Sequence, residues 1–165
     1  MDIQNLAAWG EFLGGIGGLV AAAAVVASLI FVGSQIHHSA NAAQATVRHA
    51  IAESVVNLTK LQLDDSVGLA LRKDRAGEAI DEDDRQALGI YFTIFWRTYE
   101  NAFYQFRKGL LEEDEWRSHR KILHSFLKSS NASKFTFDMF SREGVLPPAF
   151  THEVETILTE VHGSK

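Results

Sequence analysis

The stretch that decides the fold is "LGGIGGLVAAAAVVASLIFVGSQIHH", residues 13–38, which contains no Asp, Glu, Lys or Arg. As a helix rising about 1.5 Å per residue it would be roughly 39 Å long, enough to cross a hydrocarbon core of about 30 Å. Its polar side chains are mild or terminal, because the serines can bond to their own helix and His37 and His38 lie where the lipid headgroups begin. The stretch predicts a transmembrane helix over residues 12–38, after a short N-terminal segment of residues 1–11.

Two other interpretations of this stretch are a buried core helix and a cleaved secretory signal. The following segment "SANAAQA", residues 39–45, offers small residues at the spacing of a processing site. The preceding segment "MDIQNLAAWGE", residues 1–11, has no Lys or Arg, whereas a signal peptide begins with positive charge. The sequence therefore favours an uncleaved span.

Small residues recur four apart on one face of this predicted span, at Gly10, Gly14, Gly18 and Ala22. Such a face lets two helix backbones approach closely, which is how helices associate where lipid is as apolar as leucine. Gly and Ala are also simply common in membrane helices. We expect this face to bind a second copy of the chain or another membrane protein.

The charges that flank the span indicate its orientation. Asp2 and Glu11 precede it without any Lys or Arg, whereas His37, His38 and then Arg48 lie on the other side. Positive charge is retained in the cytoplasm, so we expect the N-terminus outside and the C-terminal part inside. The absence of cysteine agrees with a reducing compartment.

The remainder, residues 39–165, reads as an all-α cytoplasmic domain. Over the whole chain 16 Lys and Arg stand against 21 Asp and Glu, for a net charge of −5, and no basic stripe with interleaved aromatics occurs. This composition argues against nucleic-acid binding. No run alternates apolar and polar residues, and the only prolines are Pro147 and Pro148. Strands are therefore not predicted.

The membrane helix is expected to continue without a break to about Leu63, because residues 34–67 contain neither Gly nor Pro. "RKDRAGEAIDEDD", residues 72–84, is interpreted as a charged connector with Asp81 as the N-cap of the next helix. That helix would carry an aromatic core stripe and end at Gly109, and further helices would follow. The predicted fold is an anchor helix packed with a small helical hairpin or bundle. The residues of the aromatic stripe are Phe92, Phe95, Trp96, Tyr99, Phe103 and Phe106.

The segment "ENAFYQFRKGLLEEDEW", residues 100–116, resembles a family of small bacterial single-span membrane proteins to which no activity is assigned. The resemblance covers most of the chain and implies the same layout in a bacterial inner membrane. One departure is Glu112, where the family has Asp, which is a better helix cap. The matching positions, which we expect to be structural, are Glu100, Asn101, Tyr104, Gln105, Arg107, Gly109, Leu110, Leu111 and Trp116.

Candidate chemistry is sparse. A buried Glu100 among aromatics could act as an acid or base, although an ion pair or hydrogen bond with Arg97, Arg107 or Tyr104 is the simpler interpretation. Two helical pairs could each supply two metal ligands, but no third ligand is evident, so neither a metal nor a cofactor is predicted. His37 and His38 could form a ring in an oligomer that binds anions, metal or lipid phosphate, or they could be plain interfacial residues. The helical pairs are His49 with Glu53 and Glu115 with His119.

Three functions remain open. The sequence favours a non-enzymatic, membrane-anchored scaffold or accessory subunit that is oligomeric or part of a larger membrane complex. A small homo-oligomeric channel or pore is the first alternative, although the span offers no charge to line a water path. An enzyme at the membrane surface that uses Glu100 is the second.

Overall fold

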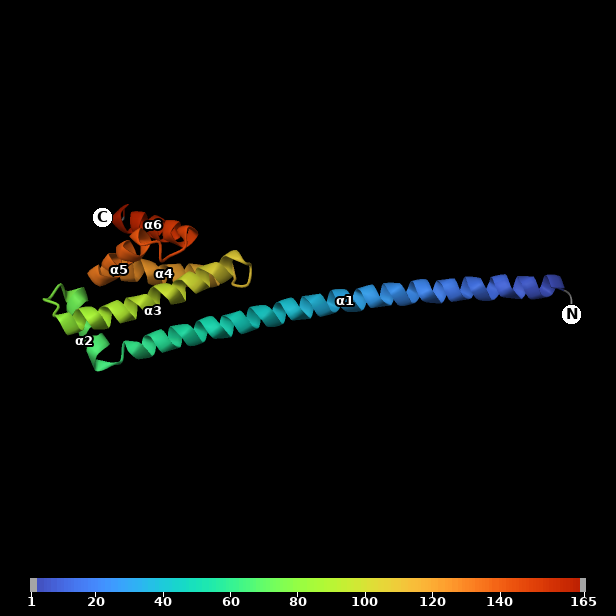
Figure 1. The fold of residues 1–165 in the computed structure, drawn as a ribbon, viewed down its shortest axis with the longest axis horizontal. Helices are drawn as coiled ribbons and strands as arrows, with labels where there is room; N and C mark the ends of the chain where they lie inside the picture. The colour runs from blue at the N-terminus through green and yellow to red at the C-terminus, as the bar shows by residue number, and fades with distance from the viewer. Residues whose placement is uncertain (1–2, 164–165) are drawn as a thin grey trace. The chain divides into compact units, whose positions relative to one another are not determined.

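The computed structural model describes the backbone of residues 3–163 and the side chains of residue 15 and residues 17–163. This part of the chain consists of six α-helices and contains no strand, as Figure 1 shows. The all-α prediction is confirmed. The helices are α1 (Ile3–Leu61), α2 (Asp65–Ala76), α3 (Glu82–Arg107), α4 (Glu113–Ser129), α5 (Asn131–Arg142) and α6 (Pro148–Gly163).

The chain divides into two units, Met1–Ala43 and Gln44–Lys165, and the boundary lies inside α1. The helix is continuous through residues 34–61, as the lack of Gly and Pro there predicts. It begins at Ile3, earlier than the expected start near Phe12, because no residue of the first turns breaks a helix.

Within the first unit, the described side chains of α1 are all exposed. Among them are large apolar ones, with Leu19 73 % and Ile30 69 % exposed. By length and hydropathy this helix could cross a membrane. A water-soluble helix buries such side chains against a core, so this surface needs lipid or another protein to cover it.

The second unit is a bundle built around α3, whose aromatic stripe forms the core. Phe92, Phe95 and Trp96 are fully buried, Tyr99 is nearly so, and Phe103 and Phe106 pack against them. Each ring of this size removes about 150–250 Å² from water, so the stripe dominates the core. The predicted core role of these residues is confirmed. Other helices complete the core with Ile51 and Leu58 from α1, Trp116, Leu123 and Leu127 from α4, and Phe150, Val154 and Ile157 from α6.

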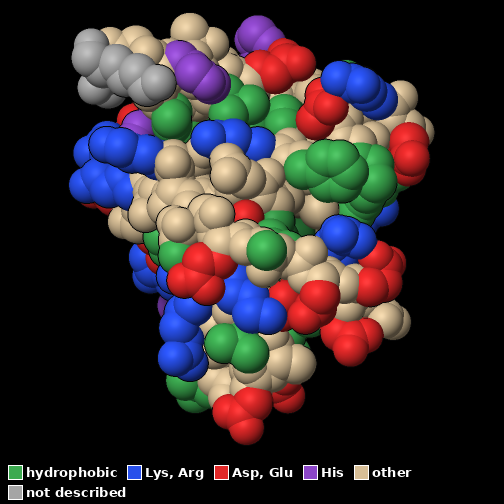
Figure 2. Space-filling model, turned by 90° about the vertical axis from the view of Figure 1, so that its left-hand side faces the viewer, with side chains coloured by type: hydrophobic (Ala, Val, Ile, Leu, Met, Phe, Trp, Pro, Cys, Tyr) green, Lys and Arg blue, Asp and Glu red, His purple; other side chains and the backbone are tan. Residues whose placement is uncertain are grey.

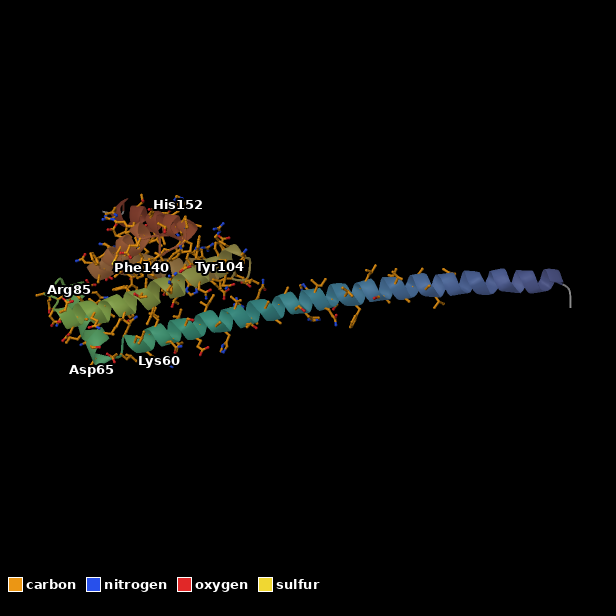
Figure 3. The ribbon with its side chains drawn as sticks, viewed as in Figure 1. Lys60, Asp65, Arg85, Tyr104, Phe140 and His152 are labelled. Carbon is orange, nitrogen blue, oxygen red and sulfur yellow. The ribbon has the colours of Figure 1, made fainter. Side chains whose placement is uncertain are left out.

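Part of the predicted connector over residues 72–84 is helical instead. Helix α2 runs to Ala76, and Gly77, at φ 71°, ends it in the left-handed conformation that favours glycine. The helix forms because Leu71 and Asp74 lie on a buried face. Asp74 is buried because its carboxylate binds the start of another helix. The first part of this charged segment is therefore a packed helix and not a solvent-exposed loop. Figure 3 shows Lys60 and Asp65 on the two sides of the α1–α2 corner.

The residues that cap the two ends of α3 are the ones that the sequence predicts. Asp81 is its N-cap and accepts a hydrogen bond from the Asp84 N–H at 2.8 Å, while the Asp84 carboxylate accepts one from the Asp81 N–H at 3.2 Å. At the other end Gly109 has φ 72°, and the Leu110 N–H donates to the Gln105 carbonyl at 3.0 Å. This is the glycine-ended motif that closes many helices, so the predicted cap at Asp81 and the glycine end at Gly109 are confirmed.

Candidate functional site

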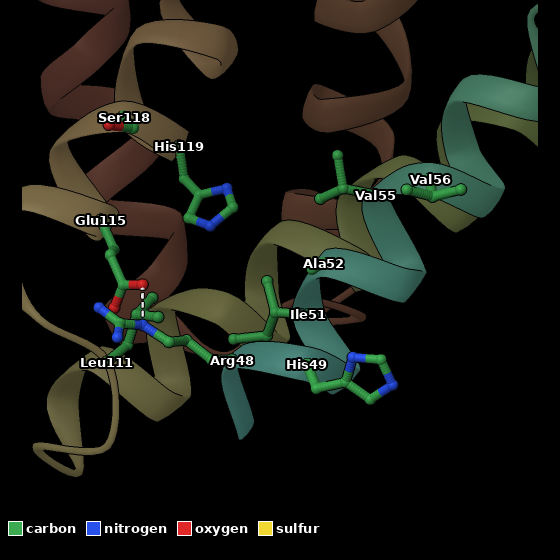
Figure 4. A pocket seen from close by; sticks show the side chains of 10 residues that line it. All are labelled: Arg48, His49, Ile51, Ala52, Val55, Val56, Leu111, Glu115, Ser118 and His119. Atoms are coloured by element: carbon green, nitrogen blue, oxygen red, sulfur yellow. Dashed lines mark hydrogen bonds and ion pairs between the residues drawn. The ribbon is translucent and has the colours of Figure 1, made fainter. Parts of the chain in front are cut away.

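An open groove of about 670 Å³ lies between α1 and α4 in the second unit and is called here the α1–α4 groove (Figure 4). Half of its lining residues are aliphatic, and the polar ones come from both α1 and α4. Ile51, which is 3 % exposed, seals the floor toward the core. The lining residues are Arg48, His49, Ile51, Ala52, Val55, Val56, Leu111, Glu115, Ser118 and His119.

An ion pair between Arg48 and Glu115 joins the two walls of the groove. The Arg48 Nε donates a hydrogen bond to Glu115 Oε1, and an Arg48 terminal nitrogen lies 3.6 Å from Glu112 Oε2. Glu115 also accepts a hydrogen bond from the Glu112 N–H at 3.1 Å, which holds the first turn of α4. Burial by itself raises the pKa of Glu115, but these hydrogen bonds and the Arg48 charge together lower it below its usual value. The carboxylate is therefore ionised near neutral pH.

A second contact from α1 holds the loop between α3 and α4. The Gln44 Nε2 donates a hydrogen bond to the Gly109 carbonyl at 3.2 Å. Gly109 is the glycine that follows α3, so Gln44 of α1 binds the chain where it turns from α3 toward α4. Gln44 and Arg48 lie four residues apart, one turn of the same helix face, and thus form two adjacent anchor points.

His119 stands one helical turn beyond Glu115 and faces the groove (Figure 4). Its ring packs edge-on against the Tyr99 ring with centroids 5.7 Å apart. Its Nδ1 is buried and has no hydrogen-bond partner among the described residues. Burial lowers the pKa of His119, because a charged ring would lose its hydration there, while the neighbouring Glu115 charge acts in the opposite direction.

The residues predicted for association lie in the first unit. Gly18 and Ala22 are exposed on α1, and no atom lies within 4 Å of where a Cβ on Gly18 would be. Gly10 and Gly14 fall outside the residues whose side chains are described. His37 and His38 are exposed on the same helix.

The motif over residues 100–116 forms the corner between α3 and α4. Trp116 stacks on Phe106 with ring centroids 5.8 Å apart and an interplanar angle of 16°. Tyr104 is exposed beneath the Lys108 ammonium, and Gln105 donates to the Asn101 side-chain oxygen at 3.2 Å. Arg107 is exposed beside a cavity of about 60 Å³ that Glu100 also lines.

Glu100 pairs with Arg97, whose Nη1 lies 2.7 Å from the Glu100 Oε2. This is one of the ion pairs that the sequence suggested. The side chain is 22 % exposed, at the edge of the aromatic core. The ion pair closes one turn of α3, and Tyr104 and Arg107 line the same small cavity as Glu100.

Of the two helical pairs considered as metal ligands, Glu115 and His119 of α4 both line the groove, whereas from α1 only His49 does and Glu53 is exposed outside it. No group of three His, Cys, Asp or Glu side chains suited to a metal occurs among the described residues. Glu115 is instead bound by Arg48 and by the backbone. The sequence offered no signal for that pairing, because the two residues are 67 positions apart.

Asp74 is a second feature that the sequence did not reveal. Its carboxylate accepts hydrogen bonds from the Ser130 hydroxyl and, at 3.0 Å, from the Ala132 N–H, so a residue of α2 caps the start of α5. Asp74 also lines a cavity of about 450 Å³ beside Leu88 and Phe135. The charged residues next to Asp74 in the sequence give no indication that its side chain is buried.

Charges of both signs are interspersed over the face drawn in Figure 2. Ion pairs also join helices of the second unit: Arg120 of α4 donates to Glu153 at 2.9 Å and to Glu160 at 2.7 Å on α6. Comparisons of the chain with protein-family models, curated proteins and solved structures find no match.

Proposed function

We propose that the protein is a single-pass, membrane-anchored helical scaffold or accessory subunit without catalytic activity of its own. The observation that carries the proposal is the uncovered apolar surface of α1 in the first unit, where Leu29 is 67 % and Phe31 is 62 % exposed. Burying a side chain of this kind stabilises by about 1.5–3 kcal/mol, so a helix with many of them has a strong tendency to enter lipid.

The proposed location is a bacterial inner membrane, with the N-terminus outside and residues 39–165 in the cytoplasm. The uneven distribution of flanking charge supports the orientation, since the first basic residue after the span is Arg48. The resemblance of residues 100–116 to bacterial single-span membrane proteins supports the membrane, and makes membership of that family part of the proposal.

The proposed partner is a second copy of the chain or another membrane protein, bound through the face of Gly10, Gly14, Gly18 and Ala22. The open space around Gly18 supports this, because a partner helix can approach its backbone. The polar groups of the second unit support a scaffold over an enzyme. Glu100 and Glu115 each line a cavity, and both form ion pairs, Glu100 within α3 and Glu115 between α4 and α1.

Reporter fusions test the anchor and its orientation. We expect the full chain to sediment with membranes and to resist extraction at high salt and high pH. An alkaline phosphatase fused after Lys165 should be inactive, and a cytoplasmic fluorescent reporter at the same position should be active. An active phosphatase would reverse the orientation, and release of the chain by salt would contradict the anchor.

The mass of the full chain in detergent tests association. We expect an oligomer, and we expect Gly18→Leu to dissociate it because the larger side chain separates the backbones. Gly17→Leu is the matched control, since it lies about 100° around the helix from Gly18. An oligomer unaffected by Gly18→Leu would move the contact elsewhere. A closed ring that conducts ions in vesicles would favour the channel alternative over the scaffold.

A further inference from the structure

The ion pair between α1 and α4 joins Arg48 to Glu115, with Glu112 as a second, more distant carboxylate. Glu115 is held by Arg48 from α1, and His119 follows Glu115 by four positions on α4. Side chains at this spacing are neighbours on a helix surface. A neutral His119 leaves the carboxylate to Arg48, whereas a protonated His119 competes for it.

Among the residues whose side chains the structure describes, Glu115 is the acid that acts on His119. From α3 the ring meets Tyr99, which is 2 % exposed. From α1 the groove presents Arg48, which would repel a charged ring, and aliphatic side chains such as Ile51 and Val55. On α6 the acids that face α4, Glu153 and Glu160, are bound by Arg120. Glu115 is the charged group that acts on the ring.

We propose that His119 makes the contact between α1 and α4 sensitive to pH, because protonation of its ring draws Glu115 away from Arg48 and brings water to the buried ring. The buried, unpartnered Nδ1 is the atom that must be hydrated or bonded when the ring is charged. The groove provides the space, since its 670 Å³ already separates the two helices beside Ile51.

The direction of the pH effect follows from linkage. Burial lowers the pKa of His119 in the closed contact below its ordinary value of 6.5, so the open form binds the proton more readily. The closed contact is therefore fully stable above about pH 6.5 and loses stability as pH falls below it. Glu115 keeps its charge in this range, because its pKa is lowered from 4.5. At pH 5.0 the equilibrium is therefore shifted toward the open form relative to pH 7.5.

Distance measurements on the full chain in detergent test the proposal. The sequence contains no cysteine, so Asn57→Cys on α1 and Lys121→Cys on α4 introduce two unique, exposed sites for spin labels. Between pH 7.5 and 5.0 we expect the distance distribution to move to longer values and to widen. In the same label pair His119→Phe, which keeps a ring against Tyr99, should abolish the change.

His49→Gln is the matched control, because it removes an exposed histidine of the same groove and should leave the pH response intact. Circular dichroism establishes that each variant is folded, and His119→Gln replaces His119→Phe if the latter is not. A labelled parent protein whose distances do not change with pH would overturn the proposal, and so would a response that survives both substitutions of His119.

Discussion

Glu100 illustrates at the scale of one residue how a carboxylate beside an aromatic core is used for structure. Its bond to Arg97 closes a single turn of α3, and its side chain borders a small cavity with Phe103 and Phe150. An ion pair of this kind, partly exposed, contributes less than a buried one, on the order of 1 kcal/mol. The alternative, a catalytic carboxylate, makes a different prediction for the same substitutions.

We expect Glu100→Gln to lower the melting temperature less than Glu100→Leu does, because the amide keeps a hydrogen bond to Arg97 and the leucine removes it. A difference of about 1 kcal/mol corresponds to roughly 4 °C for a unit of this size. Thermal unfolding followed by circular dichroism measures it, with Glu53→Gln on the exposed face of α1 as the control. A Glu100→Gln protein of normal stability that fails to complement a deletion of its gene would instead indicate catalysis.

At the scale of an element, the corner between α1 and α2 depends on Gly68. A Cβ on this residue would lie 2.7 Å from the backbone carbonyl oxygen of Gln62, a contact that real Cβ atoms do not make. The chain turns back at this point, with the Asp64 side chain accepting hydrogen bonds from the N–H groups of Ser66 and Val67. The turn is short because only a residue without a side chain fits against the end of α1.

We expect Gly68→Ala to destabilise the second unit by about 1–2 kcal/mol, since the forced shift costs more than the gain in helix propensity returns. Gly89→Ala is the control, because its Cβ would meet no atom within 4 Å and should stabilise α3 by up to about 1 kcal/mol. Chemical denaturation of both variants measures the difference. A Gly68→Ala protein as stable as the parent would show that the corner can adjust.

Elements whose signals are local were predicted well. The uncharged run of α1, the aromatic spacing and Asp81 cap of α3, and Gly109 at its end are each contained within a few turns of chain. Asp74 and Glu115 were not predicted in their roles, because their partners lie 56 to 67 positions away and a charged side chain looks the same in a loop as on a buried face. The sequence did not predict α2 or the pairing of α1 with α4, because both depend on these distant contacts.

For the molecule as a whole, the division at residue 43 separates the apolar helix from a unit with its own core. We expect a chain of residues 44–165 to fold as a soluble protein with helix content and a melting temperature close to those of the same residues in the full chain. The helical turn that begins at residue 44 should fray, because the fragment lacks the part of α1 that precedes it. Circular dichroism and sedimentation test this. Aggregation of the fragment would show that residues 1–43 contribute to its folding.

The bonds that Gln44 and Arg48 make to Gly109 and Glu115 also determine the order in which the chain can be completed. The Gln44 bond joins residues 65 positions apart and the Arg48 bond joins residues 67 positions apart. During translation, the face of α1 that carries these residues therefore has no partner until α3 and the start of α4 have been synthesised. Contacts of such sequence separation form slowly and leave apolar surface open to misassociation in the meantime. Within the second unit, Ile51 and Leu58 are therefore the core side chains that stay uncovered longest during translation.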